Sequence, residues 1–187
     1  MIDYASAGTY ASLYLTNRSV RRLKRWALNN IDKESRLLDY HITLCYSTKP
    51  IPYQALGLLP PLPVKPKQFS LFGKNKDYLV LEVESAFANN RQEYSKLLGA
   101  VSDFPDYKPH ISLAKGFKGE VKDLEPFDDI LYISREESVP LDPKFSPDKQ
   151  KVSPSLIKSV IDEYRKLGIS ANLDVVNRRE ADALSKV

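Results

Sequence analysis

The two histidines of this chain stand in nearly the same local sequence. His41 lies in the segment YHITL (residues 40–44) and His110 in the segment PHISL (residues 109–113), and no other histidine is present. In each segment a hydroxyl residue, Thr43 or Ser112, follows the histidine by two positions. A histidine near its ordinary pKa of about 6.5 accepts and donates protons around neutrality. These residue types therefore predict general acid–base chemistry supported by two hydroxyl donors.

The spacing of each motif also predicts where its side chains point. In a β-strand successive side chains alternate between the two faces, so His41 and Thr43 share one face and His110 and Ser112 share another. The apolar residues between them then turn to the core. The alternative interpretation is two half-buried strands whose exposed faces each happen to carry a histidine.

The elements around these motifs form a repeated pattern, in which a strand and a helix precede each histidine strand. Thr16 is expected to cap the first helix. A proline-rich stretch is expected to be a loop between two halves of the molecule. The predicted elements are a strand at 8–15, a helix from 17, a histidine strand at 39–47, the loop at 49–67, strands at 67–72 and 78–84, a helix at 86–101, a histidine strand at 107–115 and a last strand at 130–137.

Composition excludes several classes of protein. The chain has 187 residues, 42% hydrophobic and 28% charged, which is typical of one globular domain or two small lobes and argues against a disordered or fibrous chain. It has no apolar run of the roughly 20 residues that a membrane span needs, and no signal peptide is expected. Cys45 is the only cysteine, so a disulfide framework is excluded and a zinc cluster is implausible. The formal charge of +4 suits an anionic partner.

Taken together, the motifs resemble the 2H phosphoesterase superfamily. Within it the chain is most similar to the phage phosphodiesterases that defeat cyclic-oligonucleotide (CBASS) immunity. The resemblance covers about residues 8–142. It rests on the segments GTY (8–10), YHITLCYS (40–47), KP (49–50), KPHISL (108–113) and EESVPL (136–141).

The resemblance implies a two-lobed α+β fold, with antiparallel sheets facing across a cleft and helices packed outside. The catalytic domain would span 1–142, with lobes at about 8–66 and 67–142 and both histidine strands on the floor of the cleft. An extension at 143–187 carries an apolar stripe on a helix predicted at about 153–167. That helix would dock on the domain or mediate self-association.

The resemblance also implies an activity, namely metal-independent cleavage of the 3′–5′ bonds of cyclic di- or trinucleotides such as cGAMP. One of His41 and His110 would deprotonate the attacking oxygen and the other would protonate the leaving oxygen. Thr43 and Ser112 would donate hydrogen bonds to the phosphate oxygens. No cofactor, no metal, no membrane and no stable duplex nucleic acid is expected, and the expected location is the cytoplasm, of the host cell if the chain is phage-encoded. Which histidine is the base stays open.

Three further residues are expected to bind substrate. Tyr10 lies on the non-core side of the first strand and would stack on a base, or else cover the sheet edge. Phe72 stands where the related phage enzymes place an aromatic residue, although a tryptophan would be expected there. Strand parity places Glu136 on the cleft face, where it would contact a base edge or end the strand in solvent, and it places Glu137 on the other face.

The same residues are compatible with two alternative functions. One keeps the chemistry and changes the substrate to the 2′,3′-cyclic phosphate of an RNA end. The other is a non-catalytic protein that sequesters cyclic nucleotides on the same surface.

Overall fold

The computed structural model describes residues 8–102 and 106–141, which form an α+β fold of six antiparallel strands and two α-helices. The elements are β1 (Gly8–Leu15), α1 (Asn17–Asn30), β2 (His41–Ser47), β3 (Gly57–Phe72), β4 (Tyr78–Glu84), α2 (Ala86–Leu97), β5 (His110–Lys115), a 3-10 turn (Val121–Asp123) and β6 (Leu131–Leu141). The extension predicted at 143–187, its helix at about 153–167 and the self-association assigned to it lie outside the described residues.

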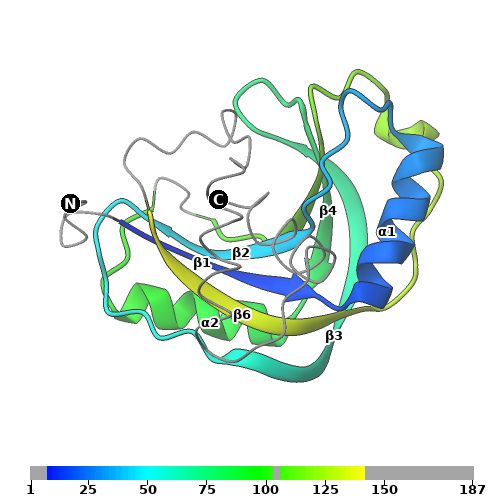
Figure 1. Cartoon of the computed structure of the whole chain (residues 1–187). Helices are drawn as coiled ribbons and strands as arrows, with labels where there is room; N and C mark the ends of the chain where they lie inside the picture. Colours follow the sequence, from blue (N-terminus) through cyan, green and yellow to red (C-terminus); the bar gives the residue numbers. More distant parts are fainter. Residues whose placement is uncertain (1–7, 103–105, 142–187) are drawn as a thin grey trace, which may run out of the picture. The chain divides into compact units, whose positions relative to one another are not determined.

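The strands close into a ring in the order β1-β2-β5-β4-β3-β6. In Figure 1 β1, coloured blue, runs between β2 and β6. Pairing crosses the boundary predicted between two lobes at residues 66 and 67, because β3 runs through it and β6 returns to pair with β1. The two histidine strands, β2 and β5, are neighbours in this ring.

One face of the sheet forms the hydrophobic core, and both helices pack on it. Trp26 of α1 stacks on Phe69 of β3, with ring centres 4.7 Å apart, and Ala88 of α2 joins the same core. The helix α1 begins as predicted, because Thr16 accepts a hydrogen bond from the backbone N–H of Ser19 at 3.3 Å. Both helices lie outside the curve of the sheet (Figure 1). The opposite face of β2 and β5 carries both histidines and is called the histidine face below.

The proline-rich stretch differs from the prediction. Residues 57–67 were expected in a loop, but they belong to the 16-residue strand β3. This strand pairs first with β6 and then with β4. Pro60 and Pro61 fall where the register with β6 breaks, between Leu58 and Leu62. A strand tolerates proline where no ladder N–H is needed, so a long strand with two successive partners accommodates this composition.

Candidate active site

The burial of β2 and β5 alternates as their sequences predict. Ile42 and Leu44 of β2 are at most 2% exposed, and Ile111 and Leu113 of β5 are fully buried. The histidine and hydroxyl residues between them are all partly exposed, namely His41, Thr43, His110 and Ser112. All four side chains therefore lie on one face of the sheet.

The register between the two strands sets these residues opposite one another. Ile42 pairs with Ile111 in an antiparallel ladder. One step to either side, His41 lies opposite Ser112 and Thr43 lies opposite His110. Residues directly opposite in an antiparallel pair have Cβ atoms about 5 Å apart. Each histidine thus has one hydroxyl residue on its own strand and a second one opposite it on the neighbouring strand.

Tyr10 of β1 is directly bonded to the first motif. Its hydroxyl lies 2.8 Å from Nε2 of His41 and 3.0 Å from Oγ1 of Thr43. Burial raises the pKa of Tyr10 far above its ordinary value of 10.0, so the phenol stays neutral. The structure brings the predicted residue to the site through its hydroxyl, which organises His41 and Thr43.

The other ring nitrogen of His41 faces a carboxylate that the sequence analysis missed. Oδ1 of Asp39 lies 3.3 Å from Nδ1 of His41, and the two side chains are 14% and 20% exposed. When the imidazole is protonated this contact is an ion pair, so the carboxylate stabilises an imidazolium at this position. The signal was present in the sequence, since Asp39 precedes His41 by two residues, the spacing that keeps side chains together in extended backbone.

His110 is held in a different way. Its Nδ1 lies 2.7 Å from the backbone carbonyl of Lys108. A carbonyl only accepts, so Nδ1 carries the proton and Nε2 of the neutral ring is the acceptor. Burial lowers the pKa of His110, the carbonyl of Lys108 opposes that shift, the charge of His41 lowers the pKa further, and Glu82 raises it. The net shift is downward, which favours a neutral imidazole.

Phe72, the second residue predicted to bind substrate, lies against His110. The two rings meet edge to face, with centres 4.8 Å apart. Phe72 comes from the end of β3 and reaches the histidine face because β3 pairs with β4 and β4 with β5. The structure therefore gathers Tyr10 and Phe72 at different histidines.

Glu136 is not on the histidine face, in contrast to the prediction. It is fully buried and lies opposite Leu13, a core residue of β1. There it accepts hydrogen bonds from Nε of Arg91 at 2.9 Å, from the hydroxyl of Tyr53 and from the backbone N–H of Leu56. Glu136 thus ties α2 and the segment before β3 to the core side of β6.

A β-bulge explains the difference. Leu15 pairs with Ile133, whereas Tyr14 pairs with Arg135, so one extra residue of β6 is inserted at this point. The insertion reverses the alternation beyond Ser134. Arg135 and Glu137 therefore share the face of Tyr14, which itself lies opposite His41. Strand parity alone could not detect the bulge.

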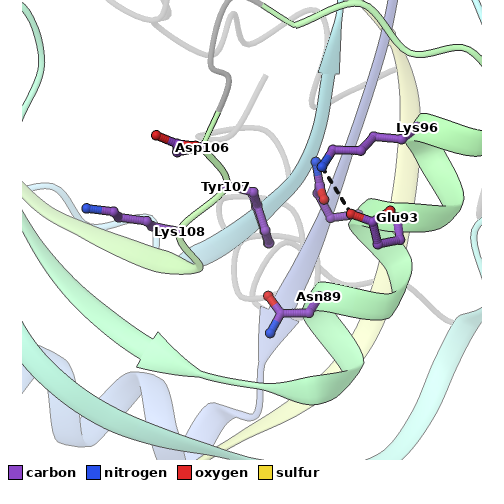
Figure 2. Close-up of a pocket in the computed structure, with 7 residues that line it drawn as sticks. Asn89, Glu93, Lys96, Asp106, Tyr107 and Lys108 are labelled. Atoms are coloured by element: carbon purple, nitrogen blue, oxygen red, sulfur yellow. Dashed lines mark hydrogen bonds and ion pairs between the residues drawn. The ribbon is translucent and has the colours of Figure 1, made fainter.

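A pocket lies between α2 and residues 106–108 (Figure 2). Its volume is about 340 Å³, and its lining is mostly polar, with Lys96 bonded to Glu93 at 3.0 Å. None of the predicted site residues lines it. Its wall nevertheless supports the site, because the hydroxyl of Tyr107 donates to the backbone carbonyl of Thr43 at 3.0 Å and Lys108 holds His110.

The chain matches one protein family over most of its length. The family model described as "Anti-CBASS protein Acb1" matches residues 7–148. The chain belongs to the Acb1 family. Three phage relatives carry the same description. The protein of Acinetobacter phage Ac42 is 38% identical over 74 residues, which cover 40% of this chain and 49% of the relative. The protein of Yersinia phage phiR1-RT is 32% identical over 118 residues, which cover 60% and 74%.

The third Acb1 relative is from Enterobacteria phage T4 and is 34% identical over 89 residues, which cover 44% of this chain and 57% of the relative. The chain thus spans about half the length of the Ac42 protein it matches. Among solved structures, the protein TT0787 of Thermus thermophilus aligns with a TM-score of 0.42 and 14% identity, covering 70% of this chain and 83% of that chain.

The described part of this Acb1 family member shows neither a group of metal ligands nor a membrane-spanning helix. Within residues 8–102 and 106–141, no group of three or more histidine, cysteine, aspartate or glutamate side chains is placed to hold a metal ion. In the same ranges, no helix combines the length and apolar character that crossing a membrane requires.

Proposed function

We propose that this protein is a phosphodiesterase that opens cyclic di- or trinucleotide messengers at a 3′–5′ bond and so helps a phage to evade CBASS immunity. The observation that carries the proposal is the placement of His41, Thr43, His110 and Ser112 on one face of two neighbouring strands. Membership of a family described as anti-CBASS supports the biological role. The host cytoplasm is where such messengers would be met.

The two histidines have different surroundings, and this difference favours different roles. His110 has a lowered pKa and a protonated Nδ1 bonded to Lys108, so its Nε2 is an unprotonated acceptor near neutrality. We assign it the role of general base. His41 faces the carboxylate of Asp39, which compensates an imidazolium charge, so we assign it the role of general acid.

The reaction then balances in atoms and protons. His110 takes the proton of the ribose 2′-hydroxyl beside the scissile phosphate, and that oxygen attacks phosphorus. The bond between phosphorus and the 5′-oxygen breaks, and His41 gives its proton to this leaving oxygen. The products are a 5′-hydroxyl and a 2′,3′-cyclic phosphate, and the nucleophile is efficient because it is already adjacent.

The two hydroxyls supply stabilisation where charge develops. Thr43 and Ser112 flank the histidines from the same strands, so a phosphate between His41 and His110 meets both donors. Donors already placed for the non-bridging oxygens cost no reorganisation during the reaction. The hydroxyl of Tyr10 is hydrogen-bonded to His41 and Thr43 and so fixes the orientation of these two side chains.

The experiment that tests the proposal is incubation of the purified chain with a panel of cyclic dinucleotides, cyclic trinucleotides and 2′,3′-cyclic mononucleotides, with products identified by mass spectrometry. The matched inactive controls are His41→Ala and His110→Ala. Linear products from cyclic di- or trinucleotides that disappear in both variants support the proposal. Cleavage of the mononucleotides alone would indicate an RNA-end enzyme, and tight binding with no product would indicate a sequestering protein.

A further inference from the structure

A row of three side chains crosses the histidine face from β6 to β2. Tyr14 of β1 lies opposite Arg135 on one side and opposite His41 on the other. The guanidinium carbon of Arg135 lies 4.4 Å from the centre of the Tyr14 ring, and that ring centre lies 6.0 Å from the centre of the His41 ring. Arg135 therefore places a permanent positive charge on the histidine face, one aromatic ring away from His41.

The guanidinium is oriented, yet one of its donors is unused. Its Nε donates to Oε1 of Glu137 at 2.7 Å, and the guanidinium lies over the ring of Tyr14 in a cation–π contact. Its Nη2 is buried and has no hydrogen-bond partner, although the whole side chain is 22% exposed. A buried charged donor without a partner is costly and rare in folded proteins. A ligand atom that accepts a hydrogen bond from Nη2 would remove this cost.

Phosphate is the ligand that best matches this arrangement. The guanidinium presents its donors as a rigid planar fork that pairs with the oxygens of a phosphate, and it stays charged at every relevant pH. Arg135 does not belong to the group that surrounds the reacting phosphate, because Tyr14 separates it from His41 and it lies two strands away from β2. A cyclic oligonucleotide has at least one phosphate besides the one that is cleaved.

We propose that Arg135 binds the second phosphate of the cyclic substrate, the phosphodiester that is not being cleaved. The inference rests on the proposed function, since it needs a substrate with two phosphates. It makes Arg135 a specificity-determining residue, because a linear dinucleoside monophosphate has a scissile 3′–5′ bond and lacks the second phosphate. Selection of cyclic messengers over RNA fragments would then depend on this side chain.

The test compares two ligands on two kinds of variant. Binding of a cyclic dinucleotide and of a dinucleoside monophosphate is measured by calorimetry in the non-cleaving His110→Ala background. Adding Arg135→Gln should weaken binding of the cyclic ligand about 10- to 100-fold, the size expected for losing charged hydrogen bonds. Binding of the monophosphate should be unchanged. In the active chain the same substitution should raise KM for the cyclic substrate and leave kcat nearly constant.

Two controls separate binding from folding and from net charge. Arg135→Lys keeps a cation over Tyr14 without the planar fork, so it should retain the thermal stability of the parent and recover part of the affinity. Arg22→Gln removes one charge from α1, where Arg22 lies 3.8 Å from Asp129, and should leave both affinities unchanged.

The outcomes distinguish this inference from the proposed function. Equal weakening of both ligands, or of neither, in Arg135→Gln overturns the inference, whether or not the parent chain is an enzyme. A selective loss of cyclic-ligand binding in a chain that cleaves nothing would support the inference and refute the proposed cleavage reaction. Failure of the parent chain to bind the cyclic ligand at all would also overturn the inference.

Discussion

Replacement of Glu136 by glutamine tests whether this residue has a structural role or a role in binding. The substitution keeps the size of the side chain and removes its charge. Glu136 is fully buried, and its partner Arg91 is only 15% exposed, so Glu136→Gln leaves a guanidinium in the protein interior without its counter-charge. Breaking one side of a buried ion pair costs about 3–5 kcal/mol, and the amide oxygen that glutamine retains favours the lower value.

The expected loss is measurable by thermal unfolding. For a chain of this size each kcal/mol shifts the melting temperature by about 2–4 °C, so a loss of about 3 kcal/mol predicts a decrease of roughly 6–12 °C. Turnover and KM at a temperature where the variant is fully folded should stay near the parent values, because Glu136 lies on the core side of β6. Circular dichroism and steady-state kinetics on the same preparation provide both numbers.

The neighbouring residue provides the matched control. Glu137→Gln is the same chemical change one position along β6, but Glu137 is 38% exposed and lies on the histidine face. An exposed ion pair contributes at most about 1 kcal/mol, so the melting temperature of this variant should fall by no more than about 4 °C. A Glu136→Gln variant with parental stability and a raised KM would refute the structural reasoning and restore the substrate contact predicted from strand parity.

Four further outcomes follow from the site. His41→Ala and His110→Ala should each lower kcat by about 10²–10⁴, whereas Thr43→Ala and Ser112→Ala should cost less because the proton-transfer pair stays intact, as single-turnover rates would show. Activity should survive dialysis against a strong chelator, and loss of activity that a divalent ion restores would contradict the proposed chemistry. The acid limb of kcat/KM against pH should lie below the ordinary histidine value of 6.5, because His110 must be neutral to act as a base and its pKa is lowered. In the complex, the anionic phosphate of the substrate lies between His41 and His110 and should hold the one proton that this pair carries more firmly. Both limbs of the kcat profile should therefore move to higher pH. A cyclic dinucleotide of 2′-deoxyribose should bind and resist cleavage; rapid hydrolysis of it would mean that water is the nucleophile.

The alternation of apolar and polar residues was sufficient to predict the two histidine strands. Ile42, Leu44, Ile111 and Leu113 are buried as their spacing requires, and the polar residues between them share the other face. This worked because a residue in a paired strand has only two directions in which to point. The start of the first helix could also be predicted from the sequence, because Thr16 is a local cap followed by apolar residues at helical spacing.

The errors arose where pairing partners override local pattern. The alternation along β6 reverses at a bulge beside Leu15, and nothing in its composition marks the inserted residue. The prolines of β3 suggested a loop, although a break in register beside Leu58 makes room for two of them. Arg135 was missed because its significance depends on a contact with Tyr14 that only the assembled sheet provides. Asp39 was missed although its position two residues before His41 could be read from the sequence.

The pairing of β1 with β6 also has a consequence for how the protein folds. Gly8 pairs with Leu141, so the first and last strands of the ring are joined by contacts of very long sequence separation. Non-local pairing of this kind slows folding to about milliseconds to seconds, because the loop must close before its contacts form. During synthesis the ring cannot close until β6 has left the ribosome. A nascent chain that stops before Leu131 already contains both histidines and still lacks the strand that completes the sheet.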